Sequence, residues 1–65
     1  MSEAVSQISI EEQIQCAELE LEKRRTFYPK WVKEGRKHPV IAAREIAAME
    51  AVVATLKQVK EPRLL

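Results

Sequence analysis

Glycine, proline, histidine and cysteine are all scarce in this chain of 65 residues. The single thiol, Cys16, cannot form a disulfide within the chain, which fits a reducing cytosolic compartment. Cys16 and the single histidine, His38, do not make a structural zinc site, because such a site needs four ligands in paired spacings. We therefore expect no metal ion and no other cofactor.

Long apolar runs and a secretory signal are also missing. The longest uninterrupted apolar runs have four residues, as at 40–43 and 51–54, whereas a bilayer span needs about 20. Residues 1–7 lack the basic flank and the apolar run of a signal peptide. These absences predict a soluble protein of the cell interior that has no membrane partner.

The residue patterns of common enzyme sites are not found either. The chain has no glycine-rich phosphate loop, no second histidine, and no nucleophile paired with a base. Cys16 lies off the main apolar stripe among Glu12, Glu20 and Lys23, where we expect a small interface filler rather than a reactive thiol. The sequence therefore predicts that the protein is not an enzyme.

The positions of the few Gly and Pro residues predict the fold. The only Gly and two of the three Pro lie in residues 28–39, and helical patterns flank this turn segment on both sides. We therefore predict an all-α fold, a two-helix antiparallel hairpin over residues 9–61. Its helices are expected at about 9–34 and 39–60, and its ends, 1–8 and 62–65, are expected to be flexible.

Local signals support these bounds. Ser9 followed by Glu12 has the capping-box pattern of a helix start. Pro29 lacks an N–H and its ring presses on the carbonyl of the residue four positions earlier, so we predict a kink there and one further turn. Gly35 then stands where a left-handed helix cap is required. Pro39, preceded by the weak cap His38, suits the first position of the second helix.

The apolar stripes of the two helices are unequal in number. If the chain turns near residues 36 and 37, facing residues have numbers that sum to about 73, which places Leu21 beside Val52 and Val53. The stripe of the first helix then meets one stripe of the second helix. That helix has another stripe, called here the second stripe, which consists of Ile41, Ala48, Val52 and Val59.

The second stripe predicts a dimer. Each of its three large side chains is worth roughly 1.5–3 kcal/mol when fully buried, and their sum is comparable to the whole stability expected of so small a domain. A second copy of the hairpin would cover them. We therefore predict a homodimeric four-helix bundle with the second stripe as its interface.

Glu45 lies near the middle of the apolar arc of the second helix. A buried carboxylate without a partner is too costly to be left alone. One hypothesis is a buried ion pair of Glu45 with Arg25 or Arg24, which would set the register of the hairpin and share the Tyr28 hydroxyl. The alternative is a carboxylate at the rim that reaches water.

Charges are segregated along the chain, although the net charge is only +1. Residues 1–22 contain six Glu and no Lys or Arg, whereas residues 23–38 contain seven Lys and Arg and one Glu. We predict the partner-binding site in the basic node, residues 23–37. Its candidate contact residues are Arg24, Arg25, Phe27, Lys30, Trp31, Lys33, Arg36 and Lys37.

Three kinds of binding are compatible with this node. In the first, the homodimer is an adaptor or inhibitor that contacts another protein through Phe27 and Trp31; alternatively, these rings fill the core end or the dimer interface. In the second, the node binds nucleic acid through phosphate contacts and stacking, although the isoelectric point of about 7.9 is low for that role. In the third, the acidic leg of one chain meets the basic node of another and gives an antiparallel dimer or a higher oligomer.

Tyr28-Pro29, Trp31-Val32 and Gly35-Arg36 form a distinctive pattern, Tyr-Pro-x-Trp-Val-x-x-Gly-Arg, between the two predicted helices. Over about residues 18–56 the chain resembles a group of short, uncharacterised proteins encoded by bacteriophages and prophages. The residue before the second helix is His38, whereas a hydroxyl cap is expected in the group. The resemblance implies a phage or prophage origin, a bacterial cytoplasm, and a host or phage protein as partner. It implies no activity, ligand or catalytic residue.

Overall fold

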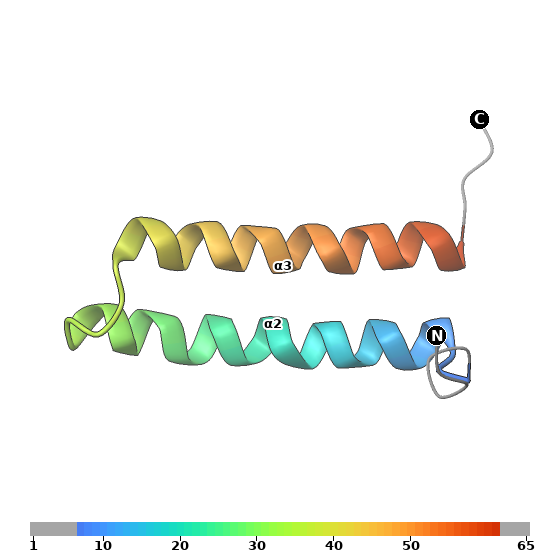
Figure 1. The fold of residues 1–65 in the computed structure, drawn as a ribbon, viewed down its shortest axis with the longest axis horizontal. Coiled ribbons are helices and arrows are strands. Elements are labelled where there is room, and N and C mark those ends of the chain that lie inside the picture. Colours follow the sequence, from blue (N-terminus) through green and yellow to red (C-terminus); the bar gives the residue numbers. More distant parts are fainter. Residues whose placement is uncertain (1–6, 62–65) are drawn as a thin grey trace.

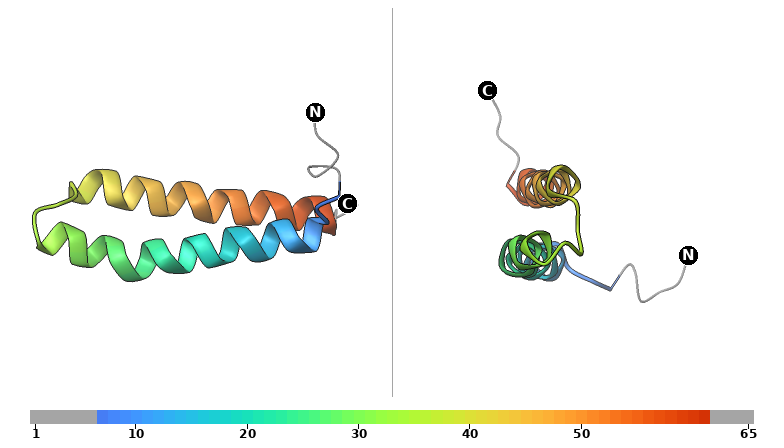
Figure 2. Two further views of the ribbon diagram at one scale, coloured as in Figure 1. Left: turned by 60° about the horizontal axis from the view of Figure 1, so that its bottom comes forward. Right: turned by 90° about the vertical axis from the view of Figure 1, so that its left-hand side faces the viewer.

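The structure is a computed structural model that describes residues 7–61, and these form two antiparallel helices joined by a tight turn (Figure 1). Helix α2 comprises Ile10–Lys33 and helix α3 comprises Pro39–Lys60. The helices lie side by side along their whole length (Figure 2). The all-α hairpin predicted from the sequence is confirmed, and both helices lie within one residue of the predicted bounds.

Most of the two predicted flexible ends lies outside the described residues. Of these ends, the structure describes only Gln7 and Ile8, which precede the first helix. Within residues 7–61, neither helix combines the length and the apolarity that a membrane span requires.

Helix α2 begins at the predicted cap. The Ser9 hydroxyl accepts a hydrogen bond from the Glu12 backbone N–H at 3.0 Å and donates to the Glu12 carboxylate at 3.4 Å. Glu11 and Glu12 occupy the first turn, where their charge complements the positive end of the helix dipole. The cap and the first turn therefore favour a helix start at this position.

Helix α2 continues through Pro29 and ends in a Schellman motif. The Arg36 N–H donates to the Trp31 carbonyl at 2.8 Å, and the Gly35 N–H donates to the Val32 carbonyl at 3.0 Å. Gly35 has a φ of +76°, the left-handed conformation that this motif requires. Helix α3 then begins at Pro39, where His38 Nδ1 accepts from the Val40 N–H at 3.1 Å.

The core between the helices is small. Its buried residues come from both helices and are Ile14, Ala17, Leu21, Ala42 and Val53. Ile46, Met49 and Leu56 are only partly buried beside this cluster. Because a two-helix hairpin has just one internal seam, it covers one stripe of each helix and no more.

Leu21→Ala is expected to lower the free energy of unfolding by about 2–4 kcal/mol, since Leu21 is one of the few large buried side chains. Leu19→Ala, at an exposed position of the same helix, is the matched control and should change it by less than about 0.5 kcal/mol. Urea unfolding followed by circular dichroism measures both. Equal effects of the two substitutions would contradict the assigned core.

Pro29→Ala is expected to raise the free energy of unfolding by about 1–3 kcal/mol. Pro29 lies inside α2, where it removes one backbone hydrogen bond, and alanine restores the N–H at an exposed position. The same urea titration tests this. A destabilised variant would show that the proline has a structural role that outweighs the missing hydrogen bond.

Candidate protein-binding surface

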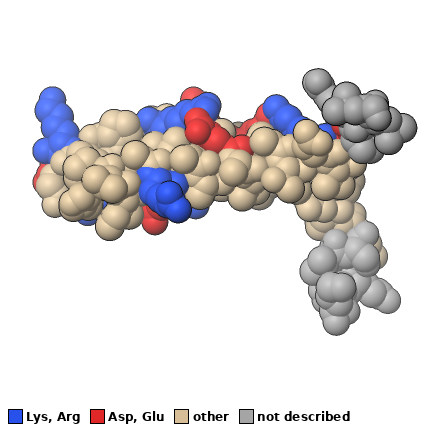
Figure 3. All heavy atoms as spheres, turned by 90° about the horizontal axis from the view of Figure 1, so that it is seen from above, with Lys and Arg blue, Asp and Glu red and all other residues tan. Residues whose placement is uncertain are grey.

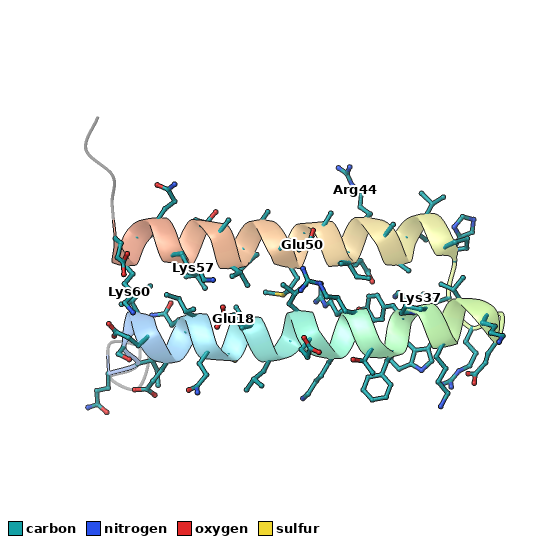
Figure 4. The ribbon with its side chains drawn as sticks, turned by 180° about the vertical axis from the view of Figure 1, so that it is seen from behind. Glu18, Lys37, Arg44, Glu50, Lys57 and Lys60 are labelled. Carbon is teal, nitrogen blue, oxygen red and sulfur yellow. The ribbon has the colours of Figure 1, made fainter. Side chains whose placement is uncertain are left out.

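Ion pairs join the two helices along one edge of the hairpin. Arg25 contacts Glu50 at 2.7 Å and Lys57 contacts Glu18 at 3.0 Å, with Lys60 and Glu11 at 4.0 Å near the start of α2 (Figure 4). We call this the charged edge. Exposed pairs of this kind contribute about 0–1 kcal/mol each, so they favour the correct register more than they add to stability.

The charged edge borders a shallow groove of about 530 Å³ between the helices. Leu21 and Val53 lie at its floor among charged residues, and the remaining lining residues are Glu18, Glu22, Arg25, Glu50, Ala54 and Lys57. The Arg25–Glu50 and Lys57–Glu18 pairs engage both cations and two of the three carboxylates of this groove. We therefore do not assign it a ligand.

The prediction of a buried Glu45–Arg25 pair is wrong. Arg25 pairs with Glu50 instead, and Glu45 pairs with Lys37 at 2.7 Å. The Glu45 side chain remains 43% exposed, so the alternative of a carboxylate at the rim is confirmed. The reason is geometric. The Lys37 side chain extends from the turn into the space between the helices (Figure 4), and its Nζ contacts the Glu45 carboxylate.

Arg24 does contact residue 45, but through the backbone. Its Nη1 donates to the Glu45 carbonyl at 2.8 Å and its Nε donates to the Glu20 carboxylate at 3.0 Å. The hydrogen bond to Glu20 raises the pKa of Arg24 above its ordinary value. Arg24 thus bridges α2 and α3 while its own charge is paired within α2.

Three aromatic rings gather at the end of α2 near the turn. Trp31 stacks on Phe27 with ring centroids 6.0 Å apart and lies 5.5 Å from Tyr28. Cations cover this aromatic cluster: Arg36 lies over Trp31 at 5.6 Å and Lys37 lies over Tyr28 at 4.3 Å. Such contacts are worth about 0.5–1 kcal/mol each at exposed sites, and they tie the turn to α2.

The aromatic cluster borders a hollow of about 470 Å³. Phe27 is 44% exposed beside it. The lining residues are Glu20, Lys23, Arg24, Phe27, Tyr28 and Trp31. A hollow with aromatic walls and paired charges suits a side chain from another protein better than a free anion.

The structure does not bring the eight candidate residues of the basic node together. Arg25 lies on the charged edge, Lys37 lies between the helices, and Arg24, Phe27, Trp31 and Arg36 lie around the aromatic cluster. Lys30 and Lys33 are exposed in the last turn of α2. A helix distributes consecutive residues around its axis by about 100° each, which separates cations that are close in sequence.

The second stripe is exposed on the single hairpin. Ile41 is 51% exposed, Val52 is 44% exposed and Val59 is 64% exposed, and Ala48 is exposed as well. The expectation that one hairpin cannot cover this stripe is confirmed. Whether a second copy covers it stays a prediction.

The second stripe and the aromatic cluster share one face. On α2, Arg25 lies to one side of the buried Leu21, and Phe27 and Trp31 lie to the other side. On α3, Glu50 lies to one side of the buried Val53, and Val52 lies to the other side. Because Arg25 pairs with Glu50, the charged flanks face the same side. In the view onto α3, charged side chains accordingly gather along one long edge, and most of the other is uncharged (Figure 3).

Sequence reasoning missed Tyr28 as the centre of the cation contacts and missed the interhelical ion pairs. The predicted register places Glu18 near Lys57 and Arg25 near Glu50, so the signal for these ion pairs was present in the sequence. The contacts of Lys37 with Tyr28 and Glu45 depend on the path of the turn, and residue spacing along a helix does not predict that path.

The alternative of nucleic-acid binding finds little support in this arrangement. Four cations of the node, Arg24, Arg25, Arg36 and Lys37, already pair with glutamates. Each pair weakens the positive field that a polyanion would meet.

Within residues 7–61, no group of three or more His, Cys or Glu side chains is placed to hold a metal ion.

Comparison of the chain with protein family models, with curated proteins and with solved structures finds no match. The resemblance to bacteriophage and prophage proteins therefore stays a prediction.

The Glu45–Lys37 pair is expected to make stability depend on pH at the acid end. Lys37 beside Glu45 holds the pKa of that carboxyl below its ordinary value, while partial burial opposes the shift. The pair therefore stabilises the fold above the ordinary glutamate pKa of about 4.3, and its contribution is lost as the pH falls through the lowered pKa.

Glu45→Gln and Lys37→Gln should each lose less stability than the unmodified chain between about pH 5 and pH 3, since each variant lacks the pair. Urea midpoints recorded across this range provide the measurement. An acid loss of the same size in the unmodified chain and both variants would show that the pair does not couple to folding.

Proposed function

We propose that this chain is a non-enzymatic protein-interaction module that acts as a homodimer, two hairpins packing into a four-helix bundle. The observation that supports this proposal is the exposure of Ile41, Val52 and Val59 in one line along α3. The part of each side chain that is still exposed stabilises a dimer by about 1 kcal/mol when it is buried. The small core of a single hairpin makes such a contribution significant.

The size of the exposed face fits a second copy. Helices of 24 and 22 residues are about 33–36 Å long, and two of them side by side are about 20 Å wide. The face therefore offers about 600–700 Å² per copy, and two copies together reach the area typical of a specific interface. A second hairpin has the same length and width, so it would cover the face from end to end.

The further role proposed for the dimer is that of an adaptor or inhibitor of a host or phage protein in a bacterial cytoplasm. This part is supported only by the resemblance of residues 18–56 to short bacteriophage and prophage proteins. The exposed Lys30 and Lys33 at the turn would remain accessible to such a partner, because neither belongs to the second stripe or to the aromatic cluster.

Val52→Glu is expected to weaken dimerisation by at least about 100-fold, because a carboxylate without a partner would be buried in each copy. Ala47→Glu is the matched control: Ala47 is exposed on α3 on the side away from α2, so this variant should still dimerise. Sedimentation velocity at micromolar concentrations measures both, and circular dichroism reports whether the helices persist.

A monomer or an unfolded chain for Val52→Glu, together with a dimer for Ala47→Glu, is the expected result. A folded, monomeric hairpin for the unmodified chain would contradict the proposal, as would a stable dimer of the Val52→Glu variant.

A further inference from the structure

We infer that the two copies pack antiparallel, with α3 of one copy against α3 of the other and a two-fold axis passing close to residue 50. The inference rests on the proposed homodimer and specifies its geometry. The turn of each hairpin would then lie beside the start of α2 and the end of α3 of its partner. The four observations that carry it are a symmetric spacing, the position of Glu20 and Arg24, the distribution of charge, and the aromatic hollow.

The second stripe has a symmetric spacing. Its members, Ile41, Ala48, Val52 and Val59, follow one another at intervals of seven, four and seven residues. If two α3 helices cross antiparallel at residue 50, Ile41 lies opposite the partner's Val59, and Ala48 lies opposite the partner's Val52. Each apolar residue then meets an apolar residue, and a small residue meets a larger one, as two-fold symmetry requires of an isologous interface.

The parallel arrangement fails on this criterion. In a parallel dimer the two-fold axis is parallel to the helices. Rotation about this axis places α3 of one copy opposite α2 of the partner. The Arg25–Glu50 and Glu18–Lys57 contacts set the register, so Val52 would lie level with the partner's Lys23, beside the Glu20–Arg24 pair, and Ala48 would lie level with the partner's Phe27. Val52 would then face charged side chains of the partner, and the apolar-to-apolar matching of the antiparallel arrangement would be lost.

Charge favours the antiparallel arrangement as well. The first turns of α2 carry Glu11 and Glu12, whereas the last turn carries Lys30 and Lys33. Antiparallel copies place acidic starts beside basic turns, and parallel copies place the two basic turns together. Complementary fields of this kind select the orientation of an encounter more than they add to affinity.

The aromatic hollow would receive the partner's α2 in this geometry. Residue 50 of α3 is level with residue 25 of α2, since Arg25 and Glu50 are in contact at 2.7 Å. Two antiparallel α2 helices that cross at this level place Trp31 near the partner's Cys16 and Glu20. Cys16 is exposed in the single hairpin, and three aromatic residues, Phe27, Tyr28 and Trp31, line the hollow together with Glu20, Lys23 and Arg24. The aromatic cluster is thereby assigned to the dimer interface.

Cross-linking between single-cysteine variants tests the orientation. Two populations are prepared, Cys16→Ser with Ile41→Cys and Cys16→Ser with Val59→Cys, and one of them is labelled with ¹⁵N. They are unfolded, mixed and refolded together, treated with a short bismaleimide, and analysed by mass spectrometry. In the antiparallel dimer the two copies of position 41 lie about 27 Å apart along the axis, so the mixed 41–59 product should exceed either self-linked product by about tenfold.

Ala47→Cys replaces Ile41→Cys in the control, because position 47 faces away from the interface, and no mixed product with Val59→Cys is expected. Sedimentation of the same samples separates the two proposals. Dimers in which self-linked products equal or exceed the mixed product, or in which no product forms, overturn the antiparallel orientation and leave the homodimer intact. Monomers of the unmodified chain overturn the homodimer and the orientation together.

Discussion

The single seam between α2 and α3 is the constraint on which the rest of the structure depends. Two helices that meet along one line bury one stripe each, and here that stripe is built from few large side chains: Ile14, Leu21 and Val53 are buried together with two alanines. A core of this size leaves a 65-residue chain marginal unless further surface is covered. Ile41, Val52 and Val59 form one line within the apolar surface that remains exposed. Fold and proposed association are therefore linked in this molecule, since the apolar surface that the seam leaves exposed is the surface that the proposed dimer would bury.

Polar interactions divide the two faces of the hairpin. On one face, two ion pairs, Arg25–Glu50 and Lys57–Glu18, connect the helices and remain exposed to solvent. On the other, the Glu20–Arg24 pair lies within α2, and Arg24 bonds the Glu45 carbonyl, so the charge stays close to its own helix. The first face is unsuited to burial because several exposed charges would be desolvated. The second face combines aromatic rings and aliphatic side chains with the Glu20–Arg24 and Glu45–Lys37 pairs, whose desolvation opposes burial there.

Much of the fold could be predicted from the sequence because it follows from local chemistry. The Ser9 cap, the left-handed Gly35 and the Pro39 start each depend on a few neighbouring residues, and the register follows from the length of the turn. The partner of Glu45 could not be predicted in this way. It depends on the position of Lys37 in the turn. A turn residue does not follow the helical periodicity, so the partner of its long side chain cannot be derived from residue spacing. The separation of the basic-node residues onto two faces could be predicted in part. Once the buried seam is known, helical geometry places Arg25 and Trp31 on opposite sides of it.

The surroundings of Gly35 have a consequence for the chirality of the turn. A β-carbon built on Gly35 would meet nothing within 4 Å, yet the residue has a φ of +76°. Space therefore does not exclude a side chain there; only the handedness of the natural amino acids does, because L-residues are disfavoured in this conformation. A D-alanine introduced by chemical synthesis would adopt the same angle without strain and would restrict the unfolded chain more than glycine does. The reversal of the chain thus depends on a mirror-image backbone conformation that glycine adopts without strain.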